Sequence, residues 1–311
     1  MRPFLQTRRK KGWLSVVRRG GRFDIAHVVR ETGKRPRIEL CESFRIERDE
    51  ADALQRLTAA RKLGAYRATT LLAESDYRLL QIEAPTVPEA ERAQAIRWRL
   101  KDLVDFPVAN AALGVLEIPL EGAAAGRQAN VFATMAPDSV IGPKQRLFHQ
   151  SRLNLEAIEV PETAVRNVAA LFEETNRGLA FLALVDGDSL LLITYRGELY
   201  FSRRIEMSAT QLVEADADRR RQMLERLALE FQRTLDNFDR QYGFISVARL
   251  VVAAERPVPE LMTALADNLY IPVQQMDLSG VAEFPAIPEL RQPERQAQCL
   301  LAIGAALRDE E

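Results

Sequence analysis

The sequence predicts a globular protein of the α/β or α+β class, and three observations support this. Segments with the two-residue period of strands alternate along the chain with segments of helical period. The 311 residues are enough for about two domains, each with a buried core. The content of 47% apolar and 28% charged residues is that of an ordinary folded protein. Disordered, fibrous and collagen-like classes are therefore excluded.

The first part of the chain is predicted to be mostly strands. The strands at 13–17 and 23–30 form a hairpin across Gly20-Gly21, because paired glycines accept the positive φ of a tight turn. The elements that follow are a strand at 37–46, a helix at 49–63, and strands at 68–73 and 77–83.

A helix is predicted to begin at Thr86, which forms a capping box with Glu89, and Pro88 lies in its first turn. The helix ends before Phe106-Pro107. Its apolar positions repeat at helical spacing: Ala93, Ile96, Leu100 and Leu103. The next elements are a strand pair at 113–118 and 130–135 around a Gly/Ala-rich loop at 122–126, a helix at 143–153 and a strand at 155–160.

The second half is predicted to open with three consecutive antiparallel strands. They lie at 179–185, 189–195 and 199–206, with Gly-containing turns between them. A long amphipathic helix follows, with one apolar face made of Leu224, Leu227, Ala228, Phe231, Leu235, Phe238 and Tyr242. The last elements are a strand at 250–253, a helix at 260–269, a strand at 271–276 and a closing helix at 295–307.

The charge is balanced overall but unevenly placed. With 43 basic and 44 acidic residues the net charge is −1, so no global field attracts nucleic acid. Residues 1–22 contain eight Lys or Arg and no acid. Such a segment gains about 1 kcal/mol per cation beside an anionic membrane surface. Peripheral membrane contact and a solvated tail both remain open for it.

The compartment is predicted to be the cytoplasm. No apolar run reaches the roughly 18 residues of a membrane span, and no secretory signal follows Met1. Cys41 and Cys299 lie far apart in the sequence, which is typical of buried thiols in a reducing compartment. No disulfide is expected.

Several segments, in the right order over nearly the whole chain, resemble the PilM family of type IV pilus assembly proteins, in particular its MshI branch of MSHA-type pili. They are "QIEAPTVPEAERAQAIRWRLKDLVDFP", "LVDGDSLLLITYRGELYFSRRIEM", "LEFQRTLDNFDRQYG" and "CLLAIGAALR". The resemblance implies an actin-like (FtsA-like) two-lobed α/β fold with a small α+β subdomain inserted in the first half. The implied organisation begins with the first half, which spans 1–79 with the basic tail and continues at 160–176. The inserted subdomain spans 80–159 and the second half spans 177–294. The closing helix, 295–311, returns to the first half.

In an actin-like fold three loops hold ATP and its cation, and all three depart from the family pattern here. The first hairpin has no acid in its strand and carries Arg18 and Arg19 at its turn. The second keeps Asp186 and Gly187, but its loop is too short to wrap a phosphate. The third has Ala253 and Ala254 at the place where the family pattern is similar to Gly-Gly. We therefore expect a pseudo-ATPase with no cofactor, and ATP with Mg²⁺ only if the loops are rearranged.

No other catalytic or metal constellation is present in the sequence. The two histidines, His27 and His149, form no HExxH motif, and no Cys pair has metal-ligand spacing. No Walker loop or GxGxxG occurs either. His27 alternates with apolar residues on a strand and is expected to be structural. We predict no catalytic residues and no metal site.

The resemblance also implies a peptide groove between the first half and the inserted subdomain. In PilM it holds the short N-terminal cytoplasmic segment of the inner-membrane protein PilN. The residues carried over to this chain are Leu80 and Ile82 on the strand and Arg97 and Trp98 on the helix. Trp98 lies off the apolar stripe and so is free to anchor a partner, although packing inside its own subdomain is the alternative.

The expected function is a cytoplasmic scaffold, peripheral to the inner membrane, that links a PilN-like protein to the pilus assembly ATPase. A homodimer stays open, and nucleic acid is not an expected partner. Two alternatives are kept. One is an ATP-binding PilM-type switch. The other is a GspL-like type II secretion component, although that family continues into a membrane span and this sequence ends at Glu311.

Overall fold

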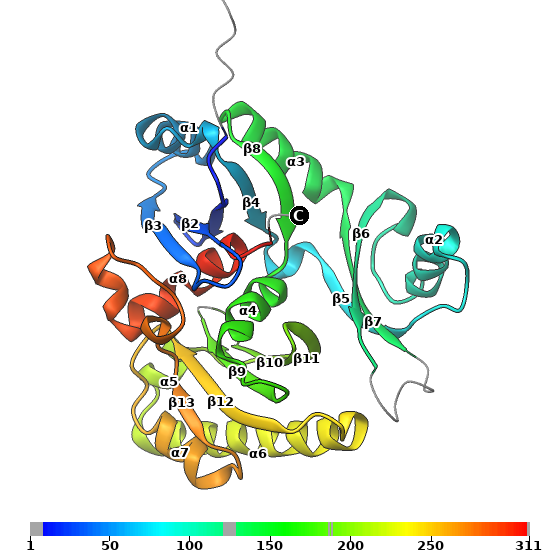
Figure 1. Cartoon of the computed structure of the whole chain (residues 1–311), viewed down its shortest axis with the longest axis vertical. Coiled ribbons are helices and arrows are strands. Elements are labelled where there is room, and N and C mark those ends of the chain that lie inside the picture. The colour runs from blue at the N-terminus through cyan, green and yellow to red at the C-terminus, as the bar shows by residue number, and fades with distance from the viewer. Residues whose placement is uncertain (1–8, 121–128, 186, 188, 310–311) are drawn as a thin grey trace, which may run out of the picture. The chain divides into compact units, whose positions relative to one another are not determined.

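The computed structural model describes residues 9–120, 129–185, 187 and 189–309 (Figure 1). The loop predicted at 122–126, Asp186 and residues 1–8 of the basic tail lie outside the described residues. The chain divides into two compact units. The first consists of Met1–Glu117, Gln128–Pro161 and Ala305–Glu311, and the second of Ile118–Arg127 and Glu162–Gly304.

The first unit is built on a five-stranded sheet with the order β3-β2-β1-β4-β8. The strands are β1 (Trp13–Arg19), β2 (Arg22–Val29), β3 (Arg37–Arg45), β4 (Arg67–Leu71) and β8 (Asn154–Glu159). The first three are antiparallel neighbours, whereas β4 runs parallel to β1 and β8 parallel to β4. Helices α1 (Glu50–Arg61) and α3 (Asp138–Gln150) cover one face, where Leu54 and Phe148 pack with Leu14, Phe23 and Ile25.

A separate three-stranded sheet with the order β5-β7-β6 belongs to the same unit. Its strands are β5 (Arg78–Glu83), β6 (Ala111–Ile118) and β7 (Asn130–Pro137). Helix α2 (Glu89–Leu100) packs on one face, where Ile96 and Leu100 meet Val131, Ala133 and Met135 of β7. We call this sheet with α2 the inserted subdomain. A small second cluster that includes Leu72, Tyr77, Ala136 and Val160 connects it to the end of the main sheet.

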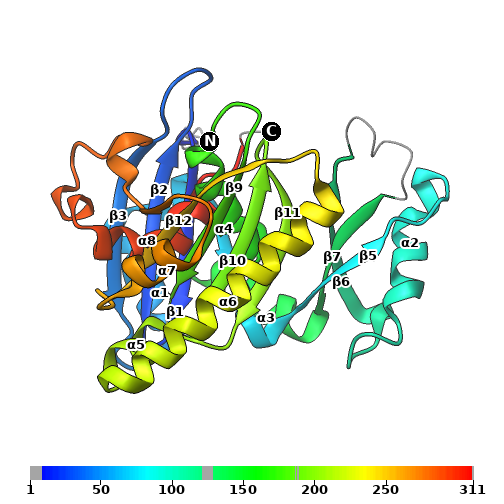
Figure 2. The same ribbon diagram turned by 90° about the horizontal axis from the view of Figure 1, so that it is seen from below.

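The second unit repeats the strand order of the first with β11-β10-β9-β12-β13. The strands are β9 (Gly178–Leu184), β10 (Ser189–Tyr195), β11 (Glu198–Ile205), β12 (Val247–Ala254) and β13 (Val273–Gln275). An antiparallel meander is again followed by two parallel strands. The helices are α4 (Pro161–Ala169), α5 (Ala209–Glu214), α6 (Ala217–Tyr242), α7 (Leu261–Asn268) and α8 (Pro293–Ala306). Figure 2 shows α6 running along this sheet.

The repeated topology is that of an actin-like, two-lobed α/β fold, as the sequence led us to expect. The predicted hairpins, the meander and the apolar face of α6 are all confirmed. Cys41 and Cys299 are buried thiols. Among the described residues, no helix combines the length and hydropathy that a membrane crossing requires.

The predicted start of the helix in the inserted subdomain is wrong. The cap is Pro88 without a side-chain hydrogen bond, and the helix begins at Glu89, so Thr86 and Glu89 form no capping box. The cause is Pro88, because a residue that precedes proline is driven out of the helical region. The apolar stripe is also shorter than predicted. Ala93 is exposed, and Leu103 lies beyond the last residue of α2, Leu100.

Three further helical segments were not anticipated from the sequence. They are α4, α5 and the first turns of α6 before Leu224. Helix α3 begins at Asp138, five residues before the expected start, and accommodates Pro143 inside it.

Candidate functional site

The inserted subdomain presents Trp98 to solvent. Trp98 is 76% exposed, and Leu103, in the turn after α2, is 57% exposed. A tryptophan buries a large apolar area when it meets a partner, and such residues dominate many interfaces. The expectation that Trp98 is not used inside its own subdomain therefore agrees with its position.

Arg97, the neighbour of Trp98, is already engaged within the subdomain. Its Nη1 donates to the carbonyl oxygens of Val108 and Ala111, at 2.7 Å each. These contacts tie α2 to the turn that leads into β6. Arg97 consequently holds the subdomain together and presents Trp98.

Leu80 and Ile82 are partly buried and pack against the cluster formed by α2 and β7. Their side chains thus contribute to the core of the inserted subdomain. The strand that carries them has another property: β5 stands at the end of the sheet order, and β7 is its one neighbour in the described sheet. An edge strand offers backbone groups to which a peptide strand can pair.

The first predicted nucleotide loop is a two-residue turn. Arg19 pairs with Arg22 across Gly20-Gly21, and Gly20 has a φ of +53°. The acid nearest to this turn in sequence, Asp24, is buried and accepts hydrogen bonds from Arg22 Nε at 2.8 Å and Ser43 Oγ at 2.5 Å. The Asp24 carboxylate therefore makes its hydrogen bonds within the sheet.

The structure describes the second predicted nucleotide loop in part and the third in full. Asp186 lies outside the described residues, whereas Gly187 is exposed with a φ of +99°. Ala253 and Ala254 are the last residues of β12 and pair with Ala183 and Leu184 of β9. Ala253 is buried. Both alanines therefore belong to a regular ladder and form no glycine-type turn. Within the described ranges, no group of three or more metal-ligating side chains is found.

No family model matches the sequence, and no curated protein matches it. Among solved structures, the chain is similar to the PilM–PilN type IV pilus biogenesis complex, with a TM-score of 0.75, 18% identity, and coverage of 95% of this chain and 98% of the other. It is also similar to the cytoplasmic domain of EpsL, an inner-membrane component of the type II secretion system of Vibrio cholerae, with a TM-score of 0.52, 13% identity and 96% coverage of both chains. At these identities the likeness shows the fold, which is the actin-like fold of both units.

Proposed function

We propose that this protein is a PilM-like scaffold of type IV pilus assembly, of the MshI type that serves MSHA pili. It binds the N-terminal cytoplasmic peptide of a PilN-like protein on the cytoplasmic side of the inner membrane and couples that protein to the assembly ATPase. The observation that carries the proposal is the structural likeness to the PilM–PilN complex over 95% of the chain.

The inserted subdomain supplies the peptide-binding surface in this proposal. Edge strand β5 pairs with the backbone of the peptide, and Trp98 covers an apolar side chain of the peptide. Leu80 and Ile82 hold β5 in place from the inner face, and Arg97 holds the end of α2. Backbone pairing supplies affinity, and the tryptophan supplies selectivity for an apolar peptide.

Fluorescence anisotropy with a labelled N-terminal peptide of the PilN-like protein tests this assignment. Trp98→Ala should weaken binding by about 2 kcal/mol, or roughly thirtyfold. The matched control is Tyr270→Ala, which removes another exposed aromatic side chain, 68% exposed, from the second unit. Equal affinity of wild type and Trp98→Ala would reject Trp98 as the anchor. Absence of binding by the wild type would reject the proposed partner.

We also propose that the protein neither binds nor hydrolyses ATP. The two-residue turn after β1, the engagement of Asp24 within the sheet and the ladder position of Ala253 and Ala254 support this view. Calorimetric titration with ATP and Mg²⁺ should give no heat of binding. Micromolar affinity would instead favour a nucleotide-controlled switch.

A second candidate function, a cytoplasmic component of type II secretion, is favoured by the likeness to the EpsL domain. Crosslinking in intact cells followed by affinity purification separates the two functions. Recovery of pilus assembly proteins supports the first proposal, and recovery of secretion proteins supports the second.

A further inference from the structure

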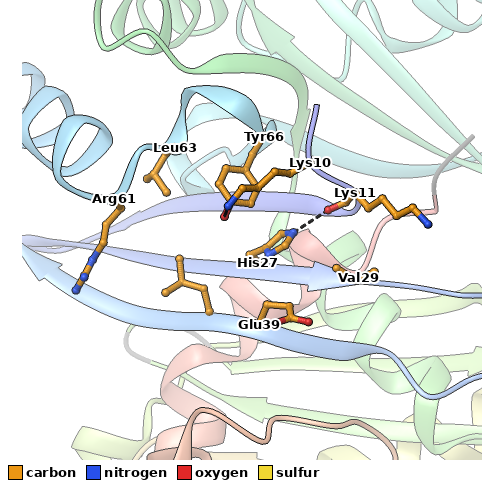
Figure 3. Close-up of a pocket in the computed structure, with 9 residues that line it drawn as sticks. Lys10, Lys11, His27, Val29, Glu39, Arg61, Leu63 and Tyr66 are labelled. Carbon is orange, nitrogen blue, oxygen red and sulfur yellow. Dashed lines mark hydrogen bonds between the residues drawn. The ribbon is translucent and has the colours of Figure 1, made fainter. Parts of the chain in front are cut away.

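A cavity of about 440 Å³ opens in the first unit beside the main sheet (Figure 3). Residues of the segment before β1, of β2 and β3, and of the end of α1 and the turn after it surround the cavity. The residues that line it are Lys10, Lys11, His27, Val29, Glu39, Leu40, Arg61, Leu63 and Tyr66. Its volume is in the range of pockets for small ligands, and it contains none of the residues assigned to peptide or nucleotide binding.

Lys10 and Tyr66 form a fixed pair of hydrogen-bond donors in this cavity. Lys10 Nζ donates to the Tyr66 hydroxyl at 2.8 Å and lies 4.6 Å from the centre of the ring. The backbone of Lys10 is also anchored, because its N–H donates to the Ala65 carbonyl at 3.1 Å. Since the tyrosine oxygen accepts from Lys10, its own hydrogen can be donated to a ligand, as can the two other ammonium hydrogens.

His27 packs against Tyr66 and binds the backbone of the segment that carries Lys10. Its ring packs edge-on against the Tyr66 ring with the centres 4.6 Å apart, and its Nε2 donates to the Lys11 carbonyl at 2.8 Å. Burial lowers the pKa of His27 below its ordinary value of 6.5, so the ring is neutral at pH 7. His27 therefore positions Tyr66 and Lys11 without adding charge.

The charges around the cavity leave a surplus of two cations. Arg61 is paired with Glu42 at 2.7 Å, and Glu39 is paired with Arg37 at 3.0 Å. Lys10 and Lys11 have no carboxylate within 4.0 Å among the described residues. In Figure 3, Lys10 lies at the centre beside Tyr66, whereas Lys11 and Arg61 lie toward opposite ends. Lys11 also acts electrostatically on Glu31, so the Lys10 ammonium group at the centre of the cavity is the one that attracts an anion.

We propose that this cavity binds a phosphoryl anion, carried either by a small phosphorylated molecule or by the headgroup of an anionic lipid. Lysine binds phosphate as a compact point charge, and a phenol hydroxyl adds a directed hydrogen bond. Val29, Leu40 and Leu63 provide an apolar wall for the remainder of the ligand. The proposal is independent of the proposed pilus function.

Two binding assays on the full chain test the proposal and separate the two sources. One is calorimetric titration with inorganic phosphate and with glycerol 3-phosphate. The other is sedimentation with phosphatidylcholine vesicles that contain or lack phosphatidylglycerol. The variants are Lys10→Gln and Tyr66→Phe, and the matched control is Lys101→Gln, which removes the same charge from an exposed lysine of the inserted subdomain. Thermal unfolding confirms that each variant is folded.

Lys10→Gln should weaken binding about tenfold and Tyr66→Phe several-fold, whereas Lys101→Gln should leave it unchanged. This pattern with the soluble phosphates identifies a free ligand, and the same pattern with anionic vesicles alone identifies a lipid headgroup. Either result supports the site. Two results would overturn the proposed site. One is binding that is unchanged in Tyr66→Phe and equally weakened in Lys10→Gln and Lys101→Gln, because that pattern reflects non-specific attraction. The other is the absence of binding in both assays.

Discussion

Gly304 is the position where a single methyl group should do most damage to the second unit. It lies in α8 against α4, and a Cβ added there would be 2.1 Å from the carbonyl oxygen of Ala164 and 2.6 Å from its carbonyl carbon. Both contacts are with backbone, which cannot rotate away as a side chain can. The carbonyl of Gly304 also accepts a hydrogen bond from Asn167 Nδ2 at 2.9 Å, which fixes the two helices to each other.

The expected size of the effect follows from two opposing contributions. Alanine is favoured over glycine in a helix by about 1 kcal/mol. Overpacking of a close helix contact costs about 1–3 kcal/mol, and the short distance to backbone places Gly304→Ala at or above the upper end. The net loss should be about 2 kcal/mol, which lowers the melting temperature by roughly 4–8 °C.

Differential scanning calorimetry measures this change, with Gly142→Ala as the matched control. Gly142 is also inside a helix, α3, but its added Cβ would meet only the end of the Arg146 side chain, at 3.2 Å. That variant should therefore keep or gain stability. A Gly304→Ala protein that melts at or above the temperature of the wild type would refute the close packing of α4 on α8.

Three more predictions concern stability. Because the pKa of His27 is lowered in the fold, its contribution to stability is complete above pH 6.5 and is lost as the pH falls through the folded pKa. His27→Gln should flatten this part of the urea-unfolding profile, and an unchanged profile would contradict this role. Burial raises the pKa of Glu173 above its ordinary value of 4.5, so its contribution to stability is complete below about pH 4.5 and is lost as the pH rises through the folded pKa. Glu173→Gln can still accept the hydrogen bond from the Gly197 N–H and should remove that decline, and an unchanged profile would show that Glu173 does not titrate as described. Arg97→Met loses two hydrogen bonds to backbone carbonyls and should lower the free energy of unfolding by about 2 kcal/mol. Trp98→Ala removes an exposed side chain and should change the free energy of unfolding by less than about 0.5 kcal/mol. Equal losses in the two variants would mean that Trp98 also supports the fold.

Local patterns were sufficient for most of the element order. Gly20-Gly21 between two alternating segments identifies the first hairpin, and the apolar positions from Leu224 to Tyr242 identify the buried face of α6. Both signals lie within a short stretch of the sequence, so no knowledge of distant residues is needed. The start of α2 was misplaced because the restriction that Pro88 imposes on Val87 outweighs the capping signal of Thr86.

The candidate surfaces depended on contacts between distant residues. Alternation along β5 shows that Leu80 and Ile82 share a face, but only the packing of α2 decides that this face is the core of the subdomain. The same holds for Arg97, whose two carbonyl partners follow it by 11 and 14 residues.

The sequence by itself determined the order and type of the main elements, the absence of catalytic motifs and the concentration of cations near residue 10. Only the tertiary structure decided which strand is an edge, where Trp98 is exposed, and that Lys10, His27 and Tyr66 meet at one cavity. The physical reason is the separation along the chain over which each effect acts. Periodicity and turn chemistry act between residues a few positions apart, whereas burial and electrostatic neighbours are set by elements that come together when the chain folds.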